Sequence, residues 1–218
     1  MKILIDIGHP GHVHLFKNFA HQMLKKGHQV HFTVRDKEFE IALLQHEGFS
    51  YTNFGRHYKK PSGKIWGLLK FTVLVIITSI KFKPDLYLSH GSIYNAVSSF
   101  FLRKPNIALE DTGNWEQVKL YLPFTEAVLT SSSLHKDYGS KQIRYCGYHE
   151  LAYLHPNYFS PRSEVLKKLG ISQNERFIII RLVSWNASHD KDQIGLSAAS
   201  LNSIIEKVEK EFRIFISA

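Results

Sequence analysis

The chain has 218 residues, of which 44% are apolar and 22% are charged, so it can bury a hydrophobic core. This composition excludes disordered and collagen-like proteins. The single cysteine, Cys146, excludes an intramolecular disulfide, and the first residues lack the apolar run of a signal peptide, so we expect a cytoplasmic protein.

The net charge of +9 is concentrated in the first part of the chain. Residues 1–83 have a net charge of +8 and residues 84–218 a net charge of +1. Residues 56–83 contain seven basic and no acidic residues, together with the longest apolar run, residues 71–80. This combination favours an anionic membrane surface, where each Lys or Arg contributes about 1 kcal/mol. A buried helix with solvated ends is the alternative. The run is shorter than the ~20 residues that span a bilayer. No nucleic-acid motif is present, so we expect no nucleic-acid partner.

Short apolar runs alternate with helical patterns over residues 1–146. The runs predict seven strands, at residues 3–7, 28–34, 50–54, 85–89, 106–109, 127–130 and 142–145. The segments between them predict helices, of which the first two end at Gly27 and Gly48, because glycine adopts the left-handed conformation of a helix C-terminus. The long basic and apolar helix ends near Pro84. A short helix capped by one of the serines at 131–133 joins the last two strands.

This alternation predicts a parallel sheet with helices on both faces. The fold class is therefore α/β, with a Rossmann-like domain at residues 1–155. Residues 156–171 are poor in apolar repeats and predict a linker. From residue 172 a second series begins, with strands at 177–182 and 212–217 around a helix at 197–210. Because two strands do not complete an α/β core, we expect residues 172–218 to be the incomplete beginning of a second domain.

Ligands of open parallel sheets bind beyond the carboxyl ends of the strands. After the first strand, Gly8 and Gly11 allow close backbone approach, and the following helix N-terminus favours a phosphate or a developing anion. His9, His12 and His14 could supply a general base near neutral pH, or they could be helix-capping residues. We do not expect a metal there, because no acid or cysteine completes a ligand set.

Two further strand ends carry polar groups. The turn after the fourth strand, Ser89-His90-Gly91-Ser92, suits hydrogen bonds to hydroxyls or phosphate, or helix capping. After the fifth strand, Glu110 and Asp111 could bind sugar hydroxyls or act as a base, or they could form a salt-bridged loop.

The first strand of the second series is followed by a third group of polar residues. Arg181, Ser184 and His189 fit an anionic ligand, because arginine presents a planar fork to phosphate oxygens. Trp185 could stack on a base or a sugar.

Three motifs together carry a resemblance to a known family. They are residues 5–14 (IDIGHPGHVH), residues 147–159 (GYHELAYLHPNYF) and residues 181–190 (RLVSWNASHD). With them, essentially the whole chain resembles a prokaryotic family of predicted glycosyltransferases, catalogued as domain of unknown function 354. Asn186 stands where that family usually has aspartate, and His149 where it often has lysine. Family members are about half as long again, which implies that most of a second domain is missing here.

The wider resemblance is to the GT-B glycosyltransferases, which have two Rossmann-like domains, and to the nucleotide-sugar 2-epimerases that share their fold. Among the transferases, the peptidoglycan N-acetylglucosaminyltransferase has a similar order of motifs. The resemblance implies an enzyme that moves a sugar from a nucleotide-sugar to a cell-envelope or lipid-linked acceptor, peripherally at the inner face of the membrane. It also implies that no metal or other cofactor is needed, because this fold stabilises the leaving diphosphate with helix dipoles and basic groups.

The resemblance implies roles for the motif residues. The base that deprotonates the acceptor would be His12 or His14, and the amides of Gly8 and Gly11 would steady a diphosphate. Two sets would bind the substrates: residues 89–92 with Glu110 the acceptor, and Arg181, Ser184 and His189 the nucleotide diphosphate.

Two other functions stay open at this point. A nucleotide-sugar 2-epimerase would need paired acids in the cleft, which Glu110 and Asp111 could provide. A truncated, inactive chain would bind only a membrane or a partner.

Overall fold

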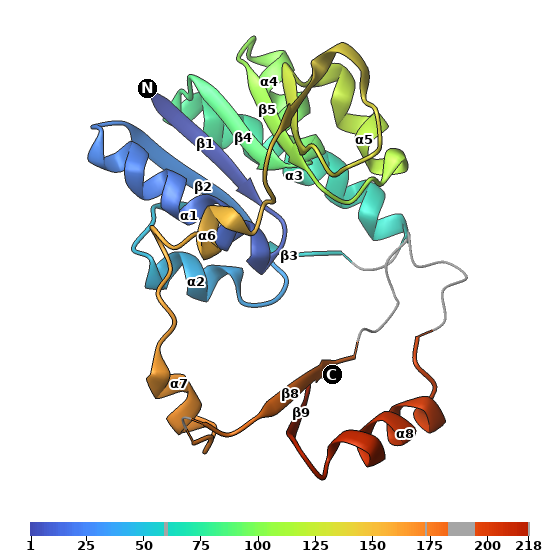
Figure 1. Cartoon of the computed structure of the whole chain (residues 1–218). Helices are drawn as coiled ribbons and strands as arrows, with labels where there is room; N and C mark the ends of the chain where they lie inside the picture. Colours follow the sequence, from blue (N-terminus) through green and yellow to red (C-terminus); the bar gives the residue numbers. More distant parts are fainter. Residues whose placement is uncertain (59–60, 173, 183–194, 218) are drawn as a thin grey trace. The chain divides into compact units, whose positions relative to one another are not determined.

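The computed structural model describes residues 1–58, 61–172, 174–182 and 195–217. The chain divides into two compact units, Met1–Phe159 and Ser160–Ala218, each with a sheet of its own (Figure 1). Of the residues predicted to bind the nucleotide, Ser184, Trp185 and His189 lie outside the described residues.

The first unit contains a seven-stranded parallel sheet in the order β3-β2-β1-β4-β5-β6-β7. The strands are β1 (Lys2–Ile7), β2 (Gln29–Asp36), β3 (Tyr51–Arg56), β4 (Leu86–His90), β5 (Asn106–Glu110), β6 (Ala127–Ser131) and β7 (Gln142–Tyr145). All seven predicted strands are confirmed. The strand order reverses between β1 and β4, which is where open α/β sheets bind their ligands.

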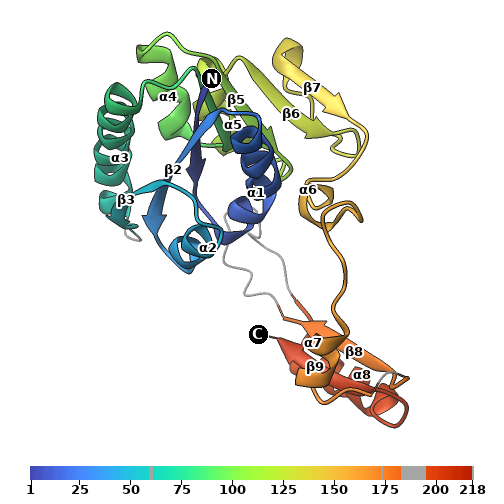
Figure 2. The same ribbon diagram turned by 90° about the vertical axis from the view of Figure 1, so that its left-hand side faces the viewer.

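Helices cover both faces of this sheet (Figure 2). They are α1 (Pro10–Lys25), α2 (Glu40–His46), α3 (Pro61–Phe82), α4 (Ile93–Phe101), α5 (Trp115–Tyr121) and α6 (Leu151–Leu154). As predicted, α1 and α2 are each followed closely by a glycine with positive φ, 79° at Gly27 and 72° at Gly48.

The alternation of side chains along β1 explains why both faces are covered. Ile3, Ile5 and Ile7 pack with residues of α1 and α2 on one face. Leu4 packs on the other face, in a cluster with Phe71 of α3. Strands that are buried on both faces are typical of parallel sheets, and they account for the continuous apolar runs in the sequence.

The prediction of a short helix after Ser131 is wrong. The connection from β6 to β7 contains a 3-10 turn at Gly139–Lys141 and no α-helix among its residues, all of which are described. Side chains form hydrogen bonds with the backbone groups that a helix would use. Gln142 donates to the carbonyl of Lys136, and Asp137 accepts from the amide of Gly139. Such local hydrogen bonds compete with helix formation.

The second unit contains α7 (Ser163–Lys168), β8 (Phe177–Arg181), α8 (Ala198–Val208) and β9 (Arg213–Ser217). Strands β8 and β9 pair in parallel, as the alternating pattern predicts. Part of the segment predicted as a linker belongs to the first unit, because Gln22 on α1 donates a 2.6 Å hydrogen bond to the hydroxyl of Tyr158.

Candidate functional site

A pocket of about 260 Å³ lies beyond the carboxyl ends of β1, β4 and β5, at the point where the strand order reverses. Of the residues predicted from the sequence, it is lined by His9, Gly11, His12, His90 and Asp111. Leu15, Thr112, His149, Glu150 and Tyr153 complete the lining. The three strand-end loops therefore share one hollow, as open α/β sheets require of a ligand site.

The glycine and histidine loop after β1 is held by its own side chains. The amide of Gly8 donates to Nδ1 of His12 at 3.3 Å, and the amide of Gly11 donates to Nδ1 of His9 at 3.1 Å. His9 thereby caps the N-terminus of α1. Both amides predicted to steady a diphosphate are thus already hydrogen-bonded within the loop.

His12 is kept neutral by its surroundings. Burial, followed by the nearby charges of His90, His9 and Arg35, lowers the pKa of His12 from 6.5 to about 2. Because its Nδ1 atom accepts the amide proton of Gly8, the proton of the neutral ring lies on Nε2. His12 therefore presents a hydrogen-bond donor and lacks the free lone pair that a base needs.

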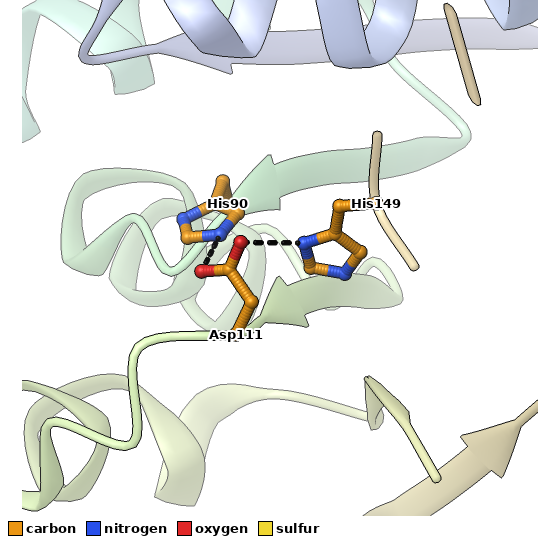
Figure 3. Close-up of side chains that lie close together, drawn as sticks. All are labelled: His90, Asp111 and His149. Carbon is orange, nitrogen blue, oxygen red and sulfur yellow. Dashed lines mark hydrogen bonds and ion pairs between the residues drawn. The ribbon is translucent and has the colours of Figure 1, made fainter. Parts of the chain in front are cut away.

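Asp111 lies between two histidines at the centre of the site (Figure 3). Nε2 of His90 is 2.9 Å from Oδ1 of Asp111, and Nδ1 of His149 is 3.1 Å from Oδ2. The ring of His90 also stacks on His12, with 4.7 Å between ring centroids. Three segments, the ends of β4 and β5 and the loop after β7, thus converge on one carboxylate.

The cluster favours a negatively charged Asp111 beside a positively charged His90. Hydrogen bonds from His149 and His90 hold the pKa of Asp111 well below its usual range, although burial opposes them. Burial alone would lower the pKa of His90, but the hydrogen bond to Asp111 and the charges of Asp111 and Glu110 outweigh burial and raise it. An ionised Asp111 beside a readily protonated His90 is the result.

His149 has one ring nitrogen without a partner. The residue is 7% exposed, and its Nε2 atom is buried and makes no hydrogen bond to any described residue. Because Nδ1 lies against ionised Asp111, the Nδ1 atom carries the proton of the neutral ring and Nε2 keeps a lone pair. A carboxylate that holds a histidine in this tautomer is the arrangement that prepares Nε2 to accept a proton.

Glu110 stabilises the loop and the helix next to the pocket through hydrogen bonds. Its Oε1 accepts hydrogen bonds from the amides of Thr112 and Gly113 and from the hydroxyl of Thr112, and its Oε2 accepts from the hydroxyl of Tyr121 at 2.8 Å. Burial and the charge of Glu110 raise the pKa of Tyr121, so that hydroxyl remains a donor. Glu110 is 2% exposed, and of the two adjacent acids it is Asp111 that lines the pocket.

The turn after β4 also has structural partners. Ser89 accepts a hydrogen bond from the amide of Ser92, and the hydroxyl of Ser92 donates to Oδ2 of Asp6 at 2.6 Å. Oδ1 of Asp6 accepts from Arg35 at 2.6 Å, in a pair that is almost fully buried. These bonds fix the turn that carries His90 against the ends of β1 and β2.

Gly91 is required by this turn. Its φ is +59°, and an added Cβ would lie 3.1 Å from Cε1 of Tyr121. A glycine there lets the chain pass close to the Tyr121 ring and present His90 to the pocket.

Two further predicted residues, His14 and Arg181, are not part of the pocket lining. His14 packs against Tyr153, with 5.7 Å between ring centroids, and is absent from the pocket lining. Arg181 is the last residue of β8 in the second unit.

The motif of residues 147–159 contains His149, but the sequence alone does not place this residue at the site. Two features of the sequence point to His149. It stands where the resembled family often has lysine, and it lies within that motif. No local pattern connects His149 with Asp111, which is 38 residues away.

A metal could use the same atoms. One ligand atom from each of His90, Asp111 and His149 lies within 4.8 Å of the others, and two imidazoles with one carboxylate can ligate a divalent cation. Protons already satisfy the two contacts to Asp111, however, so the cluster is coherent without a cation. The expectation that no metal is needed stays a prediction.

Two larger hollows lie elsewhere in the first unit. One of about 510 Å³ borders α3 and β3, and one of about 580 Å³ lies near the start of β5. Neither includes the histidine and aspartate cluster, and neither gathers the ends of β1, β4 and β5.

Solved structures with similar folds include two UDP-GlcNAc 2-epimerases and MurG. The UDP-GlcNAc 2-epimerase of Methanocaldococcus jannaschii superposes with a TM-score of 0.68 at 12% identity, over 100% of this chain and 66% of that one. The UDP-GlcNAc 2-epimerase of Neisseria meningitidis, solved with UDP-GlcNAc, gives 0.64 at 13% identity, over 99% and 71%. Acinetobacter baumannii MurG gives 0.57 at 13% identity, over 99% and 67%. At these identities the likeness shows the GT-B-like fold alone.

A curated relative extends the comparison to sequence. The chain is 25% identical over 219 residues to the uncharacterized protein MJ0665 of Methanocaldococcus jannaschii, which covers 96% of this chain. The chain spans 63% of the length of that relative. The family model described as "Protein of unknown function (DUF354)" matches residues 1–217, and the chain therefore belongs to this family.

Proposed function

We propose that the chain belongs to a GT-B glycosyltransferase that moves a sugar from a nucleotide-sugar to a hydroxyl of a cell-envelope or lipid-linked acceptor. In this proposal the first unit binds the acceptor, and β8 with Arg181 begins the nucleotide site. The fold shared with enzymes of nucleotide-sugars supports the donor class.

The observation that carries the proposal is the pairing of Asp111 with His149 at the pocket. A hydroxyl group is a weak nucleophile until a base accepts its proton. The unpartnered Nε2 atom of His149 is suited to accept that proton, and ionised Asp111 stabilises the imidazolium that forms.

The proposed step is a displacement at the anomeric carbon of the donor. The acceptor oxygen forms a bond to this carbon while its proton passes to Nε2 of His149. The bond between the anomeric carbon and the diphosphate oxygen breaks, and the nucleoside diphosphate leaves with the electron pair. The proton on His149 is later lost to solvent, which returns the base to its starting state.

We assign His12 a different role from the one that the resemblance implies. With its proton on Nε2, neutral His12 donates a hydrogen bond to an acceptor or phosphate oxygen in the pocket. His90, whose pKa is raised by Asp111 and Glu110, pairs with Asp111 and holds it in place. His14 has no part in proton transfer, because it lies outside the pocket lining.

The nucleotide-sugar 2-epimerase is the second candidate. As formulated from the sequence, it needs two acids in the cleft. Hydrogen bonds occupy Glu110, so Asp111 is the one of these two adjacent acids that lines the pocket. Glu150 also lines the pocket, so a pair of acids is still present there and the products must distinguish the two candidates.

The two candidates differ in their products. We would incubate the chain with UDP-GlcNAc, with and without lipid-linked and glycan acceptors, and follow the reaction by NMR. Release of UDP that depends on an acceptor supports the transferase. Formation of a free epimer without an acceptor contradicts it and supports the epimerase. Binding of the donor without either reaction contradicts activity of this chain and supports the third function, a binding protein.

His149→Gln tests the carrying observation, with His135→Gln as the matched control on an exposed loop residue away from the pocket. We expect His149→Gln to reduce acceptor-dependent release of UDP by about 10²–10⁴-fold and the control to leave it unchanged. An unaltered rate in His149→Gln contradicts the assignment of this residue.

A further inference from the structure

Helix α3 exposes a continuous apolar face. Six large apolar side chains on it are between 43% and 68% exposed: Ile65, Trp66, Leu69, Val73, Ile77 and Ile80. The opposite face is buried against the sheet through residues at four-residue spacing, among them Phe71 and Val75. At 3.6 residues per turn, the exposed residues cover about 120° of the helix circumference. A helix that is apolar on both faces needs a second apolar surface besides its own core.

Basic residues border this face, and the segment of the sequence that carries it is poor in acidic residues. On the helical wheel Lys70 and Lys81 lie at one margin of the exposed arc. Residues 56–109 contain nine Lys or Arg and one acidic residue, Asp85. The acid is engaged elsewhere, because Asp85 accepts a hydrogen bond from the amide of Lys2.

The neighbouring helix continues the apolar surface. Helix α4 packs beside α3 on the same face of the sheet (Figure 2), and Phe100 and Phe101 at its end are 59% and 67% exposed. Arg103 and Lys104 follow after Leu102 and are exposed. Both helices therefore combine exposed apolar residues with lysine or arginine.

We propose that the outward face of α3 is a docking surface for an anionic lipid bilayer, in which α3 lies parallel to the membrane plane. Apolar side chains would enter the boundary between headgroups and acyl chains, and the lysines at the margin would contact anionic headgroups. The positive charge of the surface selects this occupant, because an apolar patch for a second copy of this chain would bring like charges together.

The packing of α3 favours a helix that lies on the membrane over one that crosses it. Residues 65–82 have a mean hydropathy of 1.8 and are long and apolar enough to span a bilayer. One side of the helix, however, forms part of the core beneath the sheet, with Phe71 1% and Val75 0% exposed. Crossing the bilayer would remove these side chains from the core. Helix α3 follows the carboxyl end of β3 in the chain. Its first turn therefore lies on the side of the sheet where the strands end, which is also the side of the pocket.

The docking surface does not depend on the proposed reaction, so binding can be measured without a substrate. We would float the chain with vesicles of phosphatidylcholine alone and of phosphatidylcholine with phosphatidylglycerol. Binding is expected only to the anionic vesicles and should weaken as salt is raised, since exposed charges are screened.

Charge substitutions test the face itself. Leu69→Glu with Val73→Glu is expected to abolish flotation, and Lys81→Glu to weaken it severalfold. The controls are Leu120→Glu on exposed α5 and Lys25→Glu on α1, which should bind like the original chain. All five substituted positions are exposed, and thermal unfolding verifies that each variant is folded.

Fluorescence of Trp66 reports where the helix lies. With Trp115 and Trp185 replaced by Phe, the emission of Trp66 should shift to the blue on anionic vesicles. Quenching should be strongest with lipids brominated near the headgroup. Quenching at the bilayer centre, equal binding to neutral vesicles, or no flotation would each overturn the proposal. So would a dimer of the chain that Leu69→Glu dissociates, because the face would then belong to a second copy.

Discussion

Nδ1 of His149 lies 3.1 Å from Oδ2 of Asp111, although 38 residues separate them in the chain. The second oxygen of the same carboxylate lies 2.9 Å from Nε2 of His90. One carboxylate thus orients one histidine and pairs with another, and the fold brings all three to the edge where strand order reverses.

Asp111→Asn should slow acceptor-dependent transfer by about 10²–10⁴-fold, because the amide no longer fixes the proton on Nδ1 of His149 or stabilises the imidazolium. The rate of UDP release measures this. Glu116→Gln, an exposed acid in the first turn of α5, is the control and should keep the original rate. Equal rates in Asp111→Asn and the control would exclude a role for Asp111 in proton transfer.

Acid should destabilise the chain through His12. Because burial lowers the pKa of the folded His12 to about 2, the unfolded chain binds the extra proton first as the pH falls below 6.5. Unfolding is then favoured increasingly between pH 6.5 and about 2. Relative to His12→Asn, the original chain should lose stability over this range, as urea unfolding at several pH values would measure. A stability difference that does not change with pH contradicts a buried, neutral His12.

His90 should have the opposite effect. Its pKa is raised in the folded chain despite burial, because Asp111 and Glu110 favour the charged ring. Its contribution to stability is therefore present below the unfolded pKa of 6.5 and is lost as the pH rises through the higher folded value. Compared with His90→Gln, the original chain should lose stability as the pH rises through this window. A loss on acidification instead would contradict the assigned charge.

Breaking the buried ion pair of Asp6 and Arg35 should strongly lower the free energy of unfolding. Removing one partner, as in Arg35→Met, leaves Asp6 buried without its cation and should cost about 3–5 kcal/mol of unfolding free energy. The exposed pair of Lys37 and Glu38 is the control, and Lys37→Met should cost no more than about 1 kcal/mol. Similar losses in both variants, measured by urea unfolding, would contradict the importance of burial.

Metal removal tests the expectation that the reaction needs no cation. Transfer should proceed at the same rate after dialysis against EDTA, because protons satisfy the contacts between Asp111 and both histidines. A rate that falls with EDTA and returns with a divalent cation would instead assign His90, Asp111 and His149 as ligands.

The sequence predicts the sheet well because its signals are local. Each strand of the first unit is a short apolar run, and glycine marks the ends of α1 and α2. The helix expected after Ser131 is absent because side chains a few residues further along the chain bind the backbone groups of that segment. Arg144 and Gln142, at the next strand, take carbonyls of that segment with their side chains.

The site is predicted only in part because its geometry depends on distant residues. The sequence places Glu110 and Asp111 at one strand end but cannot tell which of them lines the pocket. The hydroxyl of Tyr121, from the following helix, donates a hydrogen bond to Glu110, and Asp111 is the acid that lines the pocket. His149 reaches the site only because the chain returns from β7 to α1, where Asn18 donates a hydrogen bond to the carbonyl of Ala152.

The protonation of His149 tests the central claim most directly. In ¹⁵N-histidine-labelled chain, long-range proton–nitrogen NMR spectra at neutral pH distinguish a protonated Nδ1 from a protonated Nε2, and His149→Gln assigns the signals. We expect the neutral ring to carry its proton on Nδ1 and to leave Nε2 free, and we expect a loss of this preference in Asp111→Asn. A proton on Nε2 of His149 in the original chain would contradict its role as the base.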